Sequence, residues 1–193
     1  MDITPQSQEI LETVRKKCEQ VAKPLAHVAE FGAKKVHTFI FDIDHLPDFS
    51  GESVRAHAAH KTVFDEIETI KGPVVYFFEI ISAHSSETVR AAAKSYSGPR
   101  VMPAFRNENK IDFNSRILYV GKVKSNFLAR VLQHLGYCGT EETQGMQLCH
   151  YARGLDLKLE LTVFEFEADM ADLLPLLEKA VASQLKPLLG KHQ

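Results

Sequence analysis

The sequence contains no apolar run that approaches the roughly 18 to 20 residues needed to span a bilayer. Its first ten residues also lack a basic segment followed by an apolar stretch, so we expect neither a secretory signal nor a membrane partner. Cysteine is scarce, and Cys18, Cys138 and Cys149 form no CxxC pair and no even set for disulfides. The expectation that follows is a cytoplasmic protein with reduced thiols.

Positive charge is not in excess either, because the formal net charge is -2. This value excludes a protein that is basic over its whole surface, but a nucleic-acid binder needs positive charge only where phosphates lie. Residues 115–136 form a locally basic segment without any acidic residue, and its cations are Arg116, Lys122, Lys124 and Arg130. Such clustering is more often a solvated surface than a binding site, so it supports substrate binding by this segment only weakly.

The length of 193 residues and the apolar content of 45% suit one globular domain with a smaller appendage. Apolar residues at three- and four-residue spacing predict helices, and runs rich in β-prone apolar residues predict strands. The predicted helices cover residues 6–29, 53–70, 85–94, 126–135 and 173–185. The predicted strands cover residues 36–43, 74–81, 116–120 and 157–166.

Prolines and capping residues predict where these helices end. Pro24 is expected to end or kink the first helix, because proline removes a backbone donor. Ser125 is expected to cap the helix over 126–135, with Gly136 at its C-terminal boundary. Pro175 fits a helix only if it lies in the first turn.

Four separate pieces of sequence occur in one order from residue 72 onward. GPVVY ends at Tyr76, YVGK begins at Tyr119, the next predicted helix carries Arg130 and His134, and the last carries Glu178 ahead of LKPLLG. Each piece alone is weak, because a motif such as YVGK also occurs by chance. Together they resemble the GIY-YIG nuclease superfamily, and the resemblance covers residues 70–193.

The resemblance implies an α+β fold in which residues 71–193 form a small three-stranded sheet flanked by helices. Residues 1–70 would then be a mainly helical N-terminal extension. The family usually joins its two tyrosine strands by a short hairpin, whereas 42 residues separate Tyr76 from Tyr119 here. We therefore interpret residues 82–114 as an insertion, whose basic residues suit a DNA-binding surface: Arg90, Lys94, Arg100, Arg106 and Lys110. The closing position, often asparagine in the family, is Gly190.

The resemblance also implies a function, that of a metal-dependent DNA endonuclease. Its catalytic residues would be Tyr76, Tyr119, Arg130, His134 and Glu178. Tyr76 would act on the attacking water, with Tyr119 close by. A free phenol titrates near pH ~10, so a base role requires the pKa of Tyr76 to be lowered by cations such as Lys122, Arg130 or the metal. His134 is an alternative proton carrier.

Residue chemistry and helical spacing are compatible with these roles. A lone carboxylate such as Glu178 is a plausible ligand for Mg²⁺ (or Mn²⁺), because such an ion keeps most of its waters. Arg130 can hold phosphate oxygens bidentately. Arg130 and His134 are four residues apart, so they are expected to share a helix face outside the core. Glu178 falls at the border of its helix's apolar stripe, where it can point into a cleft over the sheet.

Other interpretations remain open. Taken singly, strand tyrosines are usually core residues, and single arginine and glutamate residues are usually solvated. A catalytically inactive nucleic-acid-binding relative would keep the fold without the cleavage. The run FIFDID, with Asp42 and Asp44 at a strand end, resembles the nucleophile motif of haloacid-dehalogenase-type phosphatases, although His45 replaces the expected small residue. The N-terminal extension could recognise DNA or mediate a homodimer.

Overall fold

A computed structural model describes residues 4–47, 54–57, 60–102, 104–105, 112, 114–137 and 145–190. The α-helices are α1 (Pro5–Phe31), α2 (Lys61–Glu68), α3 (Ser86–Ser95), α4 (Phe127–Leu135), α5 (Leu148–Tyr151) and α6 (Leu174–Leu185). The strands are β1 (Lys35–Asp42), β2 (Val74–Ile80), β3 (Ile117–Val123) and β4 (Lys158–Glu165), and a 3-10 helix, η2, covers Ala168–Met170. No α-helix within the described ranges is long and apolar enough to cross a membrane.

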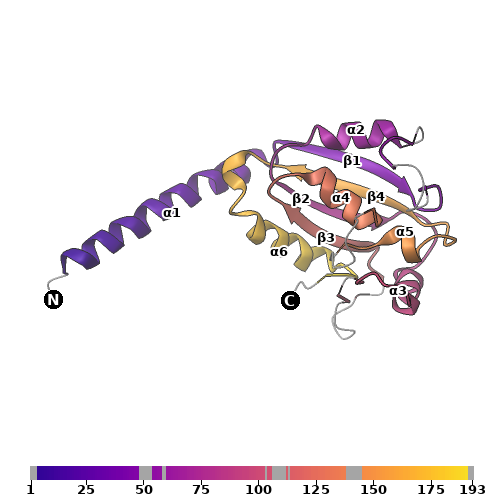
Figure 1. Cartoon of the computed structure of the whole chain (residues 1–193). Helices are drawn as coiled ribbons and strands as arrows, with labels where there is room; N and C mark the ends of the chain where they lie inside the picture. Colours follow the sequence, from indigo (N-terminus) through magenta and orange to yellow (C-terminus); the bar gives the residue numbers. More distant parts are fainter. Residues whose placement is uncertain are drawn as a thin grey trace.

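The strands form one antiparallel sheet in the order β1-β4-β2-β3 (Figure 1). The α+β class is confirmed, but the sheet has four strands where three were expected. The additional strand is β1, which pairs with β4 along its whole length, from Lys35 opposite Glu165 to Asp42 opposite Lys158. The pairing is favourable because it buries Phe39 and Phe41 of β1 in the main core.

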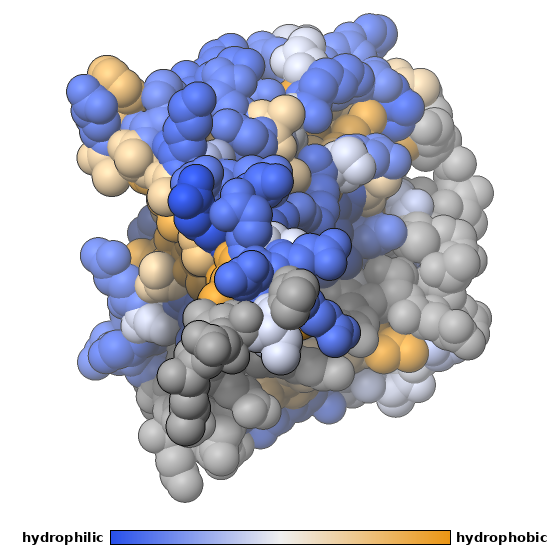
Figure 2. All heavy atoms as spheres, turned by 90° about the vertical axis from the view of Figure 1, so that its left-hand side faces the viewer, coloured by the Kyte–Doolittle hydropathy of each residue, from blue (hydrophilic) through white to orange (hydrophobic). Residues whose placement is uncertain are grey.

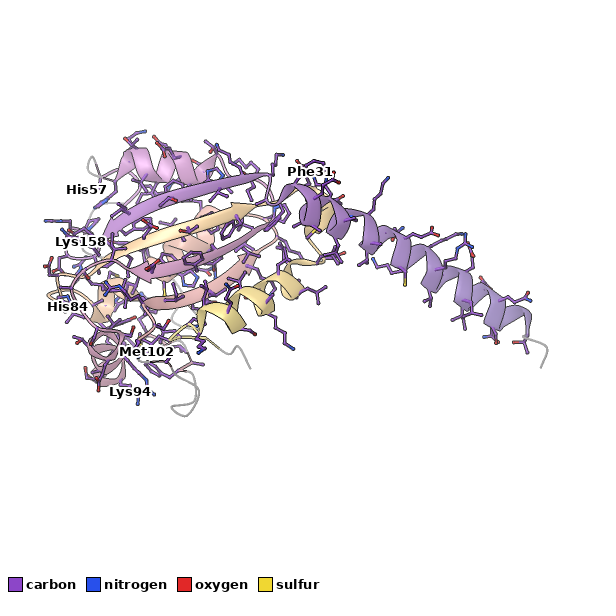
Figure 3. The ribbon with its side chains drawn as sticks, turned by 180° about the vertical axis from the view of Figure 1, so that it is seen from behind. Phe31, His57, His84, Lys94, Met102 and Lys158 are labelled. Atoms are coloured by element: carbon purple, nitrogen blue, oxygen red, sulfur yellow. The ribbon has the colours of Figure 1, made fainter. Side chains whose placement is uncertain are left out.

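Helices α4 and α6 cover opposite faces of this sheet. Tyr76 and Phe78 of the central strand β2 belong to the main core together with residues of α2 and α4. Val75 alternates with them and belongs to a second cluster with Leu174 at the start of α6. This division follows from the two-residue period of a strand. The view from behind in Figure 3 looks onto the α6 face.

Helix α1 covers the range predicted for it, and Pro24 lies inside the helix without ending it. The helix continues to Phe31 and is capped by Gly32. Val21, Leu25 and Val28 pack against the cluster that contains Met170 and Leu173, and this packing compensates for the backbone bond that Pro24 cannot make. The N-terminal part of α1 projects away from the sheet (Figure 1).

The other end signals are largely confirmed. Gly136 adopts a left-handed conformation with φ of 102° after α4, and Pro175 lies in the first turn of α6. The cap of α4 is Asn126 rather than Ser125, because the Asn126 side chain accepts a hydrogen bond from the backbone N–H of Ala129 at 3.3 Å. Helix α2 is shorter than predicted, and part of the predicted range, residues 53 and 58–59, lies outside the described residues.

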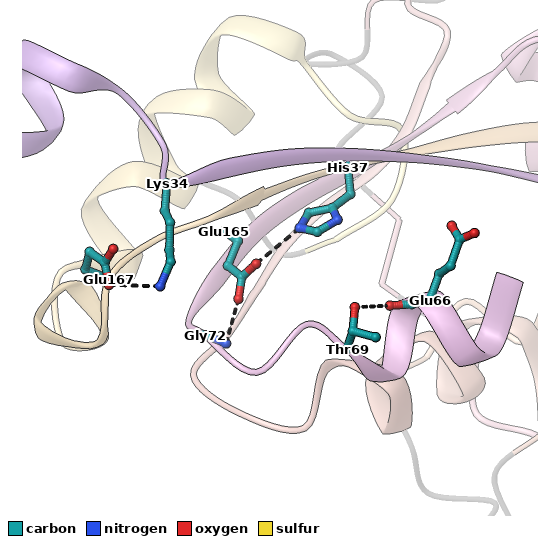
Figure 4. Close-up of polar contacts among 7 residues, drawn as sticks. All are labelled: Lys34, His37, Glu66, Thr69, Gly72, Glu165 and Glu167. Atoms are coloured by element: carbon teal, nitrogen blue, oxygen red, sulfur yellow. Dashed lines mark hydrogen bonds and ion pairs between the residues drawn. The ribbon is translucent and has the colours of Figure 1, made fainter.

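Glu165 fixes the start of β2, the strand that carries Tyr76 (Figure 4). Its carboxylate accepts a hydrogen bond from the backbone N–H of Gly72 at 3.0 Å and lies 3.1 Å from Nε2 of His37. Burial alone would raise the pKa of Glu165, but these hydrogen bonds and the His37 charge bring it below the ordinary value. Gly72 is needed here, because a Cβ atom would lie 2.8 Å from the carbonyl oxygen of Phe166.

Candidate active site

The two tyrosine strands are neighbours despite the long segment between them. In the β2–β3 register Tyr76 lies opposite Gly121, and Phe78 lies opposite Tyr119, so both phenol rings are on the α4 face. Their ring centroids are 6.2 Å apart. Gly121 makes this arrangement possible, because a Cβ atom there would lie 2.5 Å from the hydroxyl oxygen of Tyr76.

Arg130 of α4 connects the two hydroxyl groups. Its Nε donates to Tyr76 Oη at 3.3 Å, its Nη2 donates to Tyr119 Oη at 3.2 Å, and its Nη1 donates to Gln133 Oε1 at 3.0 Å. A guanidinium group has five N–H donors, so further donors remain for a ligand. No salt bridge to Arg130 occurs within the described ranges. A partly buried positive charge held by neutral hydroxyls favours the approach of an anion.

His134 completes the cluster from inside the core. The backbone N–H of Met146 donates to Nδ1 at 3.3 Å, so the neutral ring carries its proton on Nε2. That nitrogen lies 2.8 Å from Tyr76 Oη and donates to it. Burial, and then the charge of Arg130, hold the pKa of His134 well below its ordinary value. At neutral pH His134 is therefore a fixed hydrogen-bond donor and does not carry a second proton.

The prediction that His134 stays outside the core is wrong. The side chain is 0% exposed, and its ring contacts those of Tyr76, Phe78 and Tyr119. The reason is that α4 is covered on both sides. The sheet lies against one side, and the chain at Gly145 and Met146 closes the other.

Tyr76 is a neutral phenol in this arrangement. Burial, followed by the nearby Tyr119, raises the pKa of Tyr76, and the lowering effect of Arg130 does not offset them. Glu178 also raises this pKa, and Lys122 is not among its causes. A general base at this position requires a lowered pKa, so the raised pKa of Tyr76 in the ligand-free protein is a shift in the opposite direction.

Glu178 lies on the other face of the sheet. It shares a row of α6 with Leu174 and Ala182, which are 0% and 1% exposed, so its side chain points towards the sheet. Lys122 of β3 donates to Glu178 Oε2 at 2.5 Å, and the two side chains are 33% and 15% exposed, respectively. Glu178 is therefore coupled to Tyr76 through its charge, while its direct partner is Lys122.

The remaining predicted substrate-binding residues hold protein partners. Arg116 Nε donates to the carbonyl oxygen of Ile80 at 2.6 Å, and its Nη2 donates to that of Ser82, so Arg116 ties β3 to the end of β2. Lys124 forms an exposed ion pair with Asp172 at 2.6 Å. Such a pair is weak and can exchange for a phosphate.

In the described residues of the insertion that begins after β2, the α-helix is α3. Arg90 is 7% exposed and lies over the ring of Phe105 at 5.8 Å, and Lys94 lies over the same ring at 5.9 Å. The predicted basic residues Arg106 and Lys110 lie outside the described residues. Arg90 thus has a packing role, which was not expected of a DNA-binding surface.

The aspartate pair at the end of β1 has a structural role in this arrangement. Asp44 accepts hydrogen bonds from the backbone N–H groups of Gly154 and Asp156 at 2.7 and 2.8 Å. Asp42 lies 3.1 Å from His45 and 3.5 Å from Lys158. Burial opposes ionisation of Asp42, but His45 and Lys158 bring its pKa below the ordinary value. The second aspartate is thus occupied by the backbone and is not free for acid–base chemistry.

Three features of the cluster were not anticipated from the sequence. Gln133 follows Arg130 by three residues on α4, and this spacing could have predicted the hydrogen bond between their side chains. The Met146 N–H on His134 had no such signal, because it comes from a separate segment. Phe127, whose ring centroid is 5.2 Å from that of Tyr76, was expected only as part of a helix.

The comparisons with known proteins give no relative: no family model, no curated protein and no solved structure matches the chain. Within the described residues, no group of three or more histidine, cysteine, aspartate or glutamate side chains could hold a metal ion. The interpretation of the site therefore depends on the geometry of Tyr76, Tyr119, Arg130, His134, Lys122 and Glu178.

Proposed function

We propose that this protein is a metal-dependent endonuclease that hydrolyses phosphodiester bonds in DNA. The observation that carries the proposal is the position of Arg130, whose guanidinium group is held by the hydroxyls of Tyr76 and Tyr119 without a carboxylate partner in the described ranges. A phosphate is the anion that suits a guanidinium fork. The sequence resemblance to the GIY-YIG nucleases supports the same function, with Tyr76, Tyr119, Arg130, His134 and Glu178 as its catalytic residues.

The donor chemistry of Glu178 fits a hard divalent ion. A single carboxylate suffices for Mg²⁺ or Mn²⁺ when the ion keeps several waters, and only Oε2 of Glu178 is engaged by Lys122. Lys122 would release this oxygen when the ion binds. The bound ion would supply an activated water and stabilise the leaving oxygen.

The protein's own residues would bind the phosphate and position the groups that transfer protons. Arg130 binds the phosphate oxygens with its remaining N–H donors and stabilises the charge that develops on them. Tyr76 and Tyr119 orient the guanidinium group, and the fixed Nε2–H of His134 orients the Tyr76 hydroxyl. Neutralising Glu178 removes one of the charges that raise the pKa of Tyr76, which favours transfer of a proton through this phenol.

A second candidate is a nucleic-acid-binding relative that does not cleave. Two observations favour it: Lys122 occupies the carboxylate that would hold the ion, and the pKa of Tyr76 is raised. In that case Arg130 would bind phosphate without subsequent chemistry. The phosphatase interpretation is weaker, because Asp44 is occupied by backbone N–H groups.

Plasmid nicking in Mg²⁺ distinguishes these functions. We expect the wild-type protein and Asp42→Asn to nick supercoiled DNA and Glu178→Gln to be inactive. Salt-sensitive DNA binding without nicking by the wild type would select the non-catalytic relative. Hydrolysis of p-nitrophenyl phosphate that is abolished by Asp42→Asn would select the phosphatase.

A further inference from the structure

The free half of α1 carries a bare apolar stripe. Ile10, Leu11 and Val14 are 57%, 55% and 53% exposed, and Val21 and Leu25 continue the same stripe on the half that packs against the body. The projecting segment, residues 5–18, spans about 21 Å at 1.5 Å per residue. A helix of this length is marginal in water unless its apolar face is covered. We call residues 5–18 the α1 arm.

The α6 face of the sheet is also bare over β1. Val36 and Ile40 are 54% and 59% exposed, and Thr38 lies between them on the same face. The apolar clusters of α6 involve β2, β3 and Phe164, and in Figure 3 no helix of the described part crosses β1. We call Val36, Thr38 and Ile40, with the neighbouring β4 residues Glu160 and Thr162, the open sheet face.

Two carboxylates on this face lie opposite each other. Glu79 of β2 is paired with Glu160 of β4 in the strand register, and both are partly buried. Like charges directly opposite on neighbouring strands are destabilising. Neither carboxylate has a hydrogen bond or salt bridge within the described residues. The open sheet face therefore combines exposed apolar side chains with unneutralised negative charge.

The α1 arm has the complementary character. Arg15 flanks the stripe at Val14, whereas Lys17 lines a pocket of its own chain together with Asp172. Among the described residues, Arg15 is held by exposed contacts with Glu12 and Glu19, at 3.8 and 3.4 Å, and its side chain is 70% exposed. Such contacts are weak and can be exchanged for a better-placed carboxylate.

We propose that the α1 arm docks on the open sheet face of a second copy of this chain, with Arg15 near Glu79 and Glu160. The arm cannot reach the sheet of its own chain, because α1 is one continuous helix that leads away from the body (Figures 1 and 3). The eight residues of β1 span about 26 Å, so the arm, which is about 21 Å long, fits along this strand. Reciprocal exchange of two arms gives a closed two-fold dimer.

Figure 2 shows the side of the molecule from which α1 projects, and it is mainly hydrophilic with smaller apolar patches.

A dimer formed by pairing of two α1 helices would cover only the apolar stripe of the α1 arm. It would leave Val36, Ile40 and the facing carboxylates uncovered. Docking of the arm on the sheet covers both surfaces at once, and it does not depend on the proposed nuclease activity.

Sedimentation velocity of the full chain tests this dimer. We expect twice the monomer mass for the wild type, and the monomer mass for both Val14→Asp and Ile40→Asp. Leu176→Asp is the matched control, because Leu176 is 58% exposed on α6 and belongs to neither the α1 arm nor the open sheet face, and this variant is expected to stay dimeric. A monomeric wild type overturns the proposal. A dimeric Ile40→Asp alongside a monomeric Val14→Asp also overturns it and selects pairing of the α1 helices.

Amide hydrogen exchange provides a second readout that does not depend on the measured mass. Residues 8–18 are expected to be protected in the wild type and to exchange faster in both Val14→Asp and Ile40→Asp. Ile40 lies on β1, and the arm does not contact β1 of its own chain (Figures 1 and 3). Faster exchange of the arm in Ile40→Asp therefore requires contact between two chains. Unchanged protection of residues 8–18 in Ile40→Asp would contradict the docking.

Discussion

The two faces of the sheet hold their polar groups in different ways. On the α4 face, Tyr76 and His134 are fully buried and their hydrogen bonds are fixed by Arg130 and by the backbone of Met146. On the α6 face, Lys122 and Glu178 form one ion pair that retains partial contact with solvent. The first arrangement is preorganised, whereas the second can exchange partners. A site that uses both faces would therefore hold its phosphate with fixed donors and its metal with an exchangeable carboxylate.

The largest expected effect is on the fixed face. Replacing Arg130 with Gln removes the charge that we propose to bind phosphate, and we expect the rate of DNA nicking to fall by about 10²–10³-fold, as for loss of one preorganised donor. Arg55→Gln is the control, since it removes an arginine that is 44% exposed and paired with Glu68. Equal losses in the two variants would show that Arg130 has no special role.

A stability measurement compares His134 with an exposed histidine. His134→Ala leaves the Met146 N–H without its acceptor and opens a cavity in the core, so we expect a loss of about 3 kcal/mol in the free energy of unfolding. His45, whose side chain is 77% exposed, is the control, and His45→Ala is expected to cost about 0.5 kcal/mol or less. Urea denaturation measures both, and similar losses would contradict the buried network.

The ion pair on the exchangeable face should respond differently. Glu178→Leu alone leaves Lys122 partly buried without its partner, and we expect a loss of about 2 kcal/mol in unfolding free energy. The double variant Lys122→Met with Glu178→Leu is expected to regain most of this loss, because two apolar side chains replace both charges. A double variant that is less stable than the single one would indicate that the pair is as rigidly held as the tyrosine cluster.

The smallest expected effect is a pH dependence that originates from His134. Its folded-state pKa is lowered below the unfolded value of 6.5, so only the unfolded chain gains this proton as the pH falls below 6.5. Stability therefore decreases towards acid pH, by at most about 1.4 kcal/mol per pH unit from this residue. Urea denaturation of the wild type and His134→Gln between pH 5 and 7.5 measures it, and equal slopes would contradict the assignment.

Local sequence patterns predicted the elements but not all of their partners. The apolar run at Val74 and the glycine at position 136 identified β2 and the end of α4, because these signals lie within a few residues. The place of β1 in the sheet depends on pairing with β4, from Lys35 opposite Glu165, and no local pattern encodes that register. The continuation of α1 past Pro24 likewise depends on packing against Leu173 of a distant segment.

The site was predictable to a similar extent. The order of the motifs predicted one cluster that contains Tyr76, Tyr119, Arg130 and Glu178. The side chains of the first three lie together, whereas Glu178 lies on the other face of the sheet with Lys122 as its partner. Helical spacing predicted that His134 would lie outside the core, because it indicates only which side of α4 faces the sheet. The segment at Met146 covers the other side of α4, and helical spacing carries no information about that contact. The side-chain partner of Glu178 was also missed, since the contact with Lys122 joins residues 56 positions apart.

The central claim is that Tyr76 and Glu178, from opposite faces of the sheet, act on one phosphate. A kinetic cycle of DNA nicking in Mg²⁺ with the wild type, Tyr76→Phe, Glu178→Gln and the double variant tests it most directly. We expect the wild type to cleave DNA and each single variant to lose activity. The double variant should lose little more activity than the less active of the two single variants, because the residues act as a unit. A wild type that does not cleave in Mg²⁺, or losses that simply multiply, would contradict the claim.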